Sequence, residues 1–151
     1  MRTLEDKNID TVLRYFAGCN SGNVDVLLAT LASDVVHYFL PADFKTIRGA
    51  DHLANYWRKY KEVLDPTWRI DEIIGSGDRV VSEWSCLWTP PRTGQPVMTR
   101  GTEWYVLRDG LIAEVRAYFA VGADDDSELA DFPYAERGYL GRPPKTDTPA
   151  S

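Results

Sequence analysis

From Pro66 onward the sequence is a succession of β-strand patterns separated by turn residues, and this feature constrains the fold most strongly. Asp109-Gly110 lies between two apolar runs and is the strongest hairpin signal, because an Asp-Gly pair tolerates the positive φ angles of a two-residue turn. A Gly-rich turn at residues 75–78 and a Pro-rich loop at residues 90–96 separate the other runs. The predicted strands are Thr67–Ile74, Arg79–Thr89, Val97–Leu107 and Leu111–Val121. Together they predict a four-strand antiparallel meander.

The first half of the chain combines helical patterns with one strand. Apolar residues at helical spacing predict a helix over Ile9–Ala17, and Asn23 is the predicted N-cap of a second helix. The β-branched and aromatic run Val35–Leu40 predicts a strand, and Leu53–Leu64 has the spacing of a third helix. The order of elements predicts an α+β fold with three N-terminal helices on one face of a curved sheet.

Length and charge exclude several classes of protein. A chain of 151 residues fits one domain, which we expect over residues 1–122, followed by a C-terminal tail over residues 123–151. We expect the tail to strap the pocket or a dimer partner, with disorder as the alternative. The net charge of −6 and the lack of a basic run argue against nucleic-acid or membrane partners. Two isolated cysteines and an acidic N-terminus without an apolar signal core predict a cytoplasmic protein.

The last hairpin can be read by face. If Asp109-Gly110 is a two-residue turn, facing residues have numbers that sum to 219, and the more apolar face is expected to be the concave one that packs on the helices. That face would hold Arg100, Thr102, Trp104, Val106, Ala113, Val115, Ala117 and Phe119. On the other face, Glu103 would lie opposite Arg116 as a cross-strand ion pair. A change of turn length by one residue would exchange the two faces.

Several strings, in this order, resemble the SnoaL-like branch of the NTF2-like superfamily, which includes ketosteroid isomerases and polyketide cyclases. They are residues 14–16 before residues 20–23, residues 31–36, Arg48-Gly49, residues 77–81 and residues 108–114. The resemblance implies an NTF2-like cone with a mostly antiparallel sheet, a deep pocket between the helices and the concave face, and a homodimer through the convex face. It also implies enzymes that commonly need no cofactor and act on hydrophobic small molecules.

The resemblance assigns roles to only some positions. Tyr15 falls where ketosteroid isomerases place their oxyanion-stabilising tyrosine, and Trp57 falls where they have a supporting tyrosine. Phe39 stands in place of the catalytic carboxylate. Thr102, or Glu103 with a one-residue shift, stands in place of the second acid. The base of the ketosteroid isomerase mechanism is therefore absent.

Four residues are candidate catalytic groups, each with a structural alternative. His37 shares a strand face with Phe39 and could move protons near neutral pH, or it could be a buried histidine bonded to the backbone. Tyr15 could stabilise an oxyanion or simply edge the core. Arg100 could bind a substrate carboxylate at the mouth of the cone or reach water. Asp71, if it points inward near His37, could form a proton-transfer pair, or it could be solvated or paired with an arginine.

A row of alternating bulky side chains predicts an aromatic pocket. Trp84, Cys86 and Trp88 share one face of a strand, which favours either a lining for a ring-containing ligand or ordinary core packing. In epoxide-hydrolase relatives a last-strand carboxylate would stand where this chain has Ala117, so that mechanism also lacks its base. The expected substrate-binding residues are Phe39, Trp57, Trp84, Cys86, Trp88, Thr102, Trp104, Ala117 and Phe119.

These observations lead to three hypotheses. The first is a cofactor-independent enzyme of isomerase, cyclase or lyase type, less readily a hydrolase, that acts by acid/base chemistry on a hydrophobic, ring-containing molecule. The second is a non-catalytic small-molecule binding protein that uses the same pocket. The third is an interaction module that works through its convex face. No metal site is expected, because His37, His52 and the two cysteines lack ligand spacing.

Overall fold

The computed structural model describes residues 1–40, 44–120 and 128–143. Helix α1 (Leu4–Ser21) begins at a capping box in which Thr3 and Asp6 exchange side-chain to backbone hydrogen bonds. It continues beyond Ala17, where the predicted helix ends, and the missing side chain of Gly18 lets Leu27 of helix α2 (Val24–Leu28) pack directly on it. Asn23 caps α2 as predicted. Helix α3 spans Ala50–Leu64.

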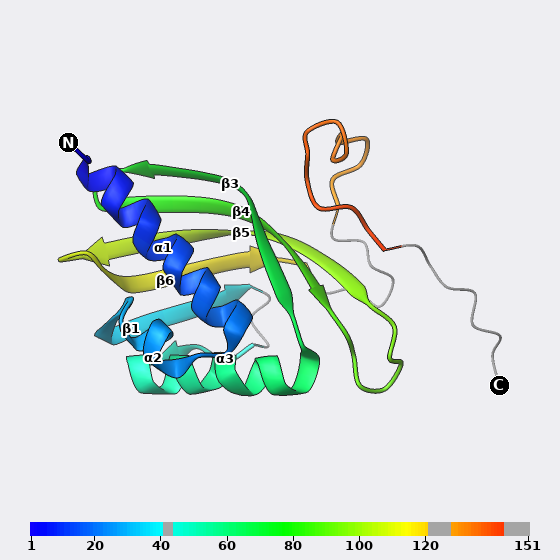
Figure 1. The fold of residues 1–151 in the computed structure, drawn as a ribbon, viewed down its shortest axis with the longest axis horizontal. Coiled ribbons are helices and arrows are strands. Elements are labelled where there is room, and N and C mark those ends of the chain that lie inside the picture. Colours follow the sequence, from blue (N-terminus) through cyan, green and yellow to red (C-terminus); the bar gives the residue numbers. More distant parts are fainter. Residues whose placement is uncertain (41–43, 121–127, 144–151) are drawn as a thin grey trace.

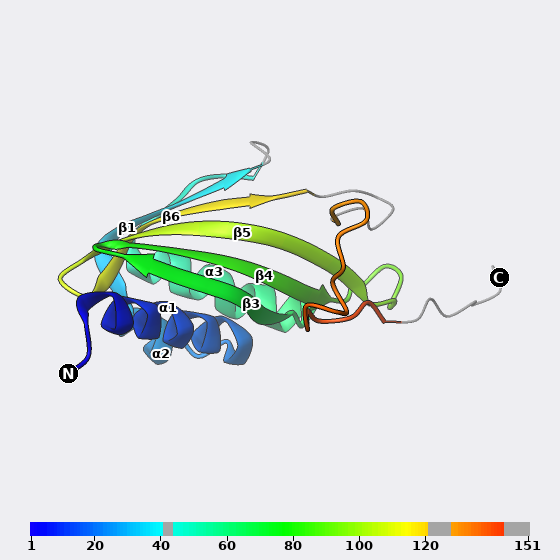
Figure 2. The ribbon, with the colours of Figure 1, turned by 90° about the horizontal axis from the view of Figure 1, so that it is seen from above.

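The six strands in the described part of the chain belong to one open, curved sheet with the order β2-β1-β6-β5-β4-β3, and the helices cover its concave face (Figure 1, Figure 2). The strands are β1 (Leu31–Leu40), β2 (Ile47–Arg48), β3 (Thr67–Ser76), β4 (Arg79–Trp88), β5 (Val97–Arg108) and β6 (Leu111–Phe119). The predicted meander is confirmed as β3 to β6, and β1 joins it by pairing parallel to β6. The short strand β2 was not predicted. No described helix has the length and apolar character needed to cross a bilayer.

The predicted register of the last hairpin holds only next to its turn. Asp109 and Gly110 both have positive φ, as a two-residue turn requires, and Leu107 lies opposite Ile112. Beyond this point Ala113 is an extra residue on β6, a β-bulge, and the pairing shifts by one. The predicted concave face is therefore correct for the end of β6 and wrong for β5.

This correction moves several predicted residues. Thr102 and Trp104 lie on the convex face, whereas Glu103 and Tyr105 are buried on the concave face. The predicted pair of Glu103 with Arg116 does not form. Glu103 lies opposite Ala117, and Arg116 lies opposite Trp104 and pairs with Glu114. Val106 lies on the convex face as well.

Residues 128–143, part of the predicted tail, pack on the convex face of the sheet. Arg100 anchors them: its guanidinium donates to Ser85 Oγ at 2.6 Å, Glu128 Oε1 at 2.9 Å and the Leu140 carbonyl at 2.8 Å. The same guanidinium lies 4.0 Å from the centre of the Tyr134 ring. The boundary between domain and tail and the aspartates at 124–126 lie outside the described residues.

Arg100→Gln is expected to lower the free energy of unfolding by about 2–3 kcal/mol, because one buried guanidinium makes all of these charge-assisted contacts. Limited trypsin digestion is expected to cut faster after Arg137 in the variant. Arg116→Gln is the matched control, since its ion pair on the same face is a third exposed and is expected to contribute under about 1 kcal/mol. Equal urea midpoints for Arg100→Gln and wild type would refute this anchoring role.

Candidate functional site

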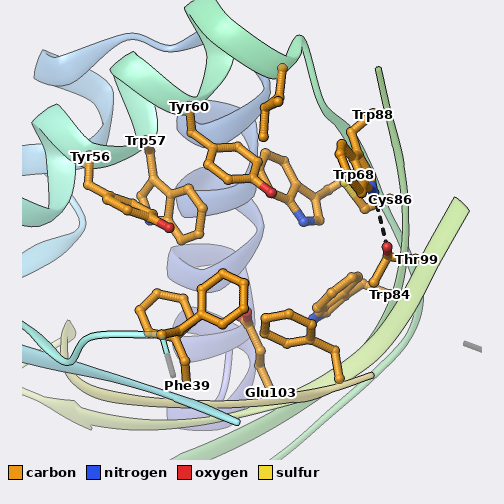
Figure 3. Close-up of a pocket in the computed structure, with 13 residues that line it drawn as sticks. Phe39, Tyr56, Trp57, Tyr60, Trp68, Trp84, Cys86, Trp88, Thr99 and Glu103 are labelled. Atoms are coloured by element: carbon orange, nitrogen blue, oxygen red, sulfur yellow. Dashed lines mark hydrogen bonds between the residues drawn. The ribbon is translucent and has the colours of Figure 1, made fainter. Parts of the chain in front are cut away.

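A cavity of about 230 Å³ lies between α3 and the concave face of the sheet (Figure 3). Its wall is almost entirely aromatic because α3 and strands β1, β3, β4 and β6 each turn rings toward it. The lining residues are Phe39, Phe44, Tyr56, Trp57, Tyr60, Leu64, Trp68, Trp84, Cys86, Trp88, Thr99, Glu103 and Phe119. Such a wall suits a flat, apolar ligand.

Glu103 is the one charged side chain among the described residues that line the cavity. It projects from β5 into the space between Phe39 and Trp84 (Figure 3) and is 6% exposed. The small side chain of Ala117 on the facing strand leaves room for the carboxyl group. Tyr105 donates a short hydrogen bond to Glu103 and in turn lies 3.2 Å from Ser82 Oγ. A carboxyl group thus stands in an otherwise apolar cavity, held from behind by a hydroxyl relay.

Burial controls the protonation of this carboxyl group. Removal from water raises the pKa of Glu103 from 4.5 to about 7, and the hydrogen bond from Tyr105 opposes the shift only in part. Near neutral pH the group is populated in both forms. It can therefore accept a proton as a carboxylate or donate one as an acid.

His37 lies on the same strand face as Phe39, as predicted, but in a different environment from the one expected. It is fully buried, stacks on Phe39 with ring centres 4.1 Å apart, and does not line the cavity. Neither ring nitrogen of His37 has a hydrogen-bond partner. The nearby backbone of Tyr38 favours the protonated imidazole, but this effect on the pKa is smaller than that of burial. Burial lowers the pKa of His37 to about 3, so the ring is neutral near pH 7.

The remaining candidate catalytic residues lie outside the cavity. Tyr15 is buried behind the wall, where its hydroxyl accepts a hydrogen bond of 2.6 Å from Trp57 Nε1. Asp71 does not approach His37; it faces the convex side, where Ser85 Oγ donates to it at 2.5 Å. Arg100 lies in the same convex cluster and not on the concave face. The positions predicted for Asp71 and Arg100 are therefore wrong, because the strands present these residues to the side away from the helices.

The predicted lining is otherwise largely found. Phe39, Trp57, Trp84, Cys86, Trp88 and Phe119 line the cavity, and Ala117 is buried beside Glu103. Burial raises the pKa of the Cys86 thiol, which argues against a nucleophile. The expected substrate-binding residues did not include Phe44, Tyr56, Tyr60, Leu64, Trp68 and Thr99, and Glu103 was named only as the alternative to Thr102. Helical spacing could have found Tyr56 and Tyr60, whereas Thr99 and Glu103 depend on the bulge.

With this geometry established, comparison with known proteins defines the class. The family model described as the SnoaL-like domain matches residues 12–115, and the chain belongs to that family. Among curated proteins no significant match is found.

The solved structures with the same fold are described in different terms. A protein of unknown function with a cystatin-like fold from Methylobium petroleophilum is 29% identical, with a TM-score of 0.69 over 95% of this chain and 97% of that one. An epoxide hydrolase of the LEH-like type from Mycobacterium tuberculosis is 21% identical, with a TM-score of 0.70 over 78% and 86%. A protein described as a SnoaL-like polyketide cyclase from Jannaschia is 21% identical, with a TM-score of 0.67 over 79% and 90%.

Proposed function

We propose that this protein is a cofactor-independent enzyme of isomerase, cyclase or lyase type that moves protons on a hydrophobic, ring-containing small molecule. One observation carries the proposal: a single carboxyl group with a pKa of about 7, Glu103, stands inside an aromatic cavity. Acid/base catalysis is most effective when the pKa of the catalytic group lies near the working pH. The SnoaL-like polyketide cyclase among the similar structures is consistent with this class of chemistry.

The proposed step uses Glu103 in both protonation states. As a carboxylate, it takes a proton from a carbon next to a carbonyl group of the ligand, and the electron pair of the C–H bond moves onto the carbonyl oxygen to give an enolate. The protonated carboxyl group then returns the proton to a different atom of the ligand. Tyr105 holds the carboxylate in place from behind. The aromatic wall excludes water and orients the ring.

A small-molecule binding protein is the second candidate. The observation that favours it is the sparse chemistry of the wall, in which Glu103 has no second ionised partner among the described lining residues. Both candidates use the same cavity, so only turnover separates them. The homodimer through the convex face stays a prediction of the family resemblance.

A depletion experiment separates the two candidates. Catalytic amounts of wild type and of Glu103→Gln are incubated with a metabolite extract, and both mixtures are compared by mass spectrometry. We expect a compound to disappear over many turnovers with wild type and to persist with the variant. Co-purification of one compound with both proteins at stoichiometric amounts, without depletion, would refute the enzyme and support the binding protein.

A further inference from the structure

We propose that the indole N–H of Trp84 is the second recognition group of the cavity and selects ligands that carry an oxygen acceptor on the ring. This inference rests on the proposed function, because it uses the same cavity, and it adds the chemical class of the ligand. The ligand class is a planar compound of one or two rings with two oxygen substituents, one that meets Glu103 and one that meets Trp84.

The indole N–H of Trp84 differs from those of Trp57 and Trp88, which both have hydrogen-bond partners. Trp57 Nε1 donates to Tyr15, and Trp88 Nε1 donates to Thr99 Oγ1 at 3.0 Å. Trp84 also lines the cavity and is 4% exposed, but its Nε1 has no hydrogen-bond partner. Buried donors are rarely left unpaired, because the loss of water is not compensated. A donor of this kind in a cavity wall is satisfied when a ligand supplies an acceptor.

Gly101 allows the indole to occupy this position. Gly101 lies directly opposite Trp84 on β5, and a Cβ atom there would come within 2.6 Å of Trp84 Cζ2. The absence of a side chain therefore lets the ring lie close to the neighbouring strand. The close approach of β5 at Gly101 thus fixes the position of the Trp84 indole.

Trp84 and Glu103 lie on the sheet side of the cavity, across from Trp57 and Tyr60 on α3 (Figure 3). Glu103 follows Gly101 by two residues on the same face of β5, so Trp84 and Glu103 are diagonal neighbours on adjacent strands. Such neighbours are separated by roughly 7–8 Å, a distance that one ring system with oxygens on two sides can bridge.

The size of the cavity limits the ligand. Pockets for drug-sized molecules occupy roughly 300–1,000 Å³, and this cavity is smaller, at about 230 Å³. Phe119 packs beside the indole with ring centres 6.0 Å apart, and it is only partly buried at the end of β6. Because Trp84 Nε1 is buried, we expect the Phe119 side chain to rotate when a ligand reaches this N–H. One or two fused rings fit these dimensions.

Binding of a matched set of ligands tests the donor. Wild type, Trp84→Phe and Trp88→Phe, labelled with ¹⁵N at the tryptophan indoles, are titrated with naphthalene and with 2,6-dihydroxynaphthalene and followed by NMR. We expect Trp84→Phe to weaken binding of the dihydroxy compound by about 2- to 10-fold, the value of one hydrogen bond, and to change the affinity for naphthalene much less. Trp88→Phe is the control, since its N–H is already bonded to Thr99, and it is expected to affect both ligands equally.

A second readout uses the wild type alone. The Trp84 indole proton, identified through its contacts with Gly101, is expected to shift downfield with the dihydroxy compound and to stay in place with naphthalene. Equal losses for both ligands in Trp84→Phe, or an indole proton that does not move, would overturn the donor and leave the proposed function intact. A wild type that binds neither compound would refute the aromatic ligand pocket itself, and the donor with it.

Discussion

Glu103→Gln is expected to stabilise the folded protein by about 3 kcal/mol near pH 9 and to leave its stability near pH 4 almost unchanged. The folded-state pKa of Glu103 is raised from 4.5 to about 7, so the folded state binds the proton more tightly than the unfolded state. The stabilisation from this proton is complete below pH 4.5 and is lost as the pH rises through 7. Glutamine resembles the protonated acid in shape and carries no charge, so it does not show this loss.

The measurement is urea unfolding of wild type and variant at several pH values. Tyr105→Phe is the companion variant, because it removes the hydrogen bond that holds the pKa of Glu103 down. We expect it to move the pH dependence to a higher midpoint. A constant difference between Glu103→Gln and wild type at all pH values would show that the carboxyl group is not perturbed by burial. It would also remove the main support for an acid/base role.

The same substitution is expected to reduce turnover of a substrate by about 10²- to 10⁴-fold. Glutamine keeps the size and the hydrogen bonds of the side chain but cannot accept a proton from carbon. If Glu103→Gln is more stable at alkaline pH but inactive, then burial of the Glu103 carboxylate lowers stability and serves catalysis. Full activity of Glu103→Gln would exclude Glu103 as the base.

His37→Phe is expected to remove an acid-side loss of stability that wild type shows. Burial lowers the pKa of His37 from 6.5 to about 3, so between these values the unfolded state binds a proton that the folded state does not. Stability from this group is complete above pH 6.5 and falls as the pH falls toward 3. The contribution lost near pH 4.5 is about 3 kcal/mol.

The test compares the change in unfolding free energy between about pH 7.5 and pH 4.5, because phenylalanine is larger and can shift the absolute stability through packing. We expect wild type to lose about 3 kcal/mol more than His37→Phe over this interval. His52→Phe is the control for the loss of an imidazole at an exposed position. Parallel curves for wild type and His37→Phe would contradict the burial of a neutral ring.

Local patterns were sufficient for the elements of the fold. The apolar spacing of α3, the Asn23 cap and the Asp109-Gly110 turn each act over a few residues, and each appears where the sequence predicts it. The strand β2 and the parallel pairing of β1 with β6 were not apparent, because they depend on contacts between distant segments.

The sequence predicted the aromatic wall of the candidate site but not which ionisable group faces the cavity. Alternation on β4 placed Trp84, Cys86 and Trp88 correctly on one wall. The acid was named only as the alternative to Thr102 after a one-residue shift, because a single extra residue at Ala113 reverses the faces of β5 relative to β6. No short-range pattern in the sequence marks that bulge. The predicted strand register therefore made Glu103 a cross-strand partner of Arg116, and only the family resemblance offered it as an acid of the site.

The cluster of Arg100, Asp71 and Ser85 on the convex face also depends on contacts that local patterns do not predict. Arg100 was treated as a site residue because the predicted register placed it on the concave face, and Asp71 because it could point inward near His37. Their partners, Glu128 and the Leu140 backbone, lie far along the chain and reach them only when residues 128–143 fold back over the sheet. Charge neutralisation between such segments cannot be inferred from spacing.

The sequence by itself determined the α+β class, the family and the aromatic composition of the pocket, because periodicity and turn chemistry act through neighbouring residues. The tertiary structure alone decided which titratable groups become functional candidates. Burial raised the pKa of Glu103 toward neutrality and lowered the pKa of His37 away from it, which reverses the roles that their intrinsic pKa values suggest. The physical reason is that the cost of burying a charge depends on the surrounding packing, which is set by contacts between residues far apart in the chain.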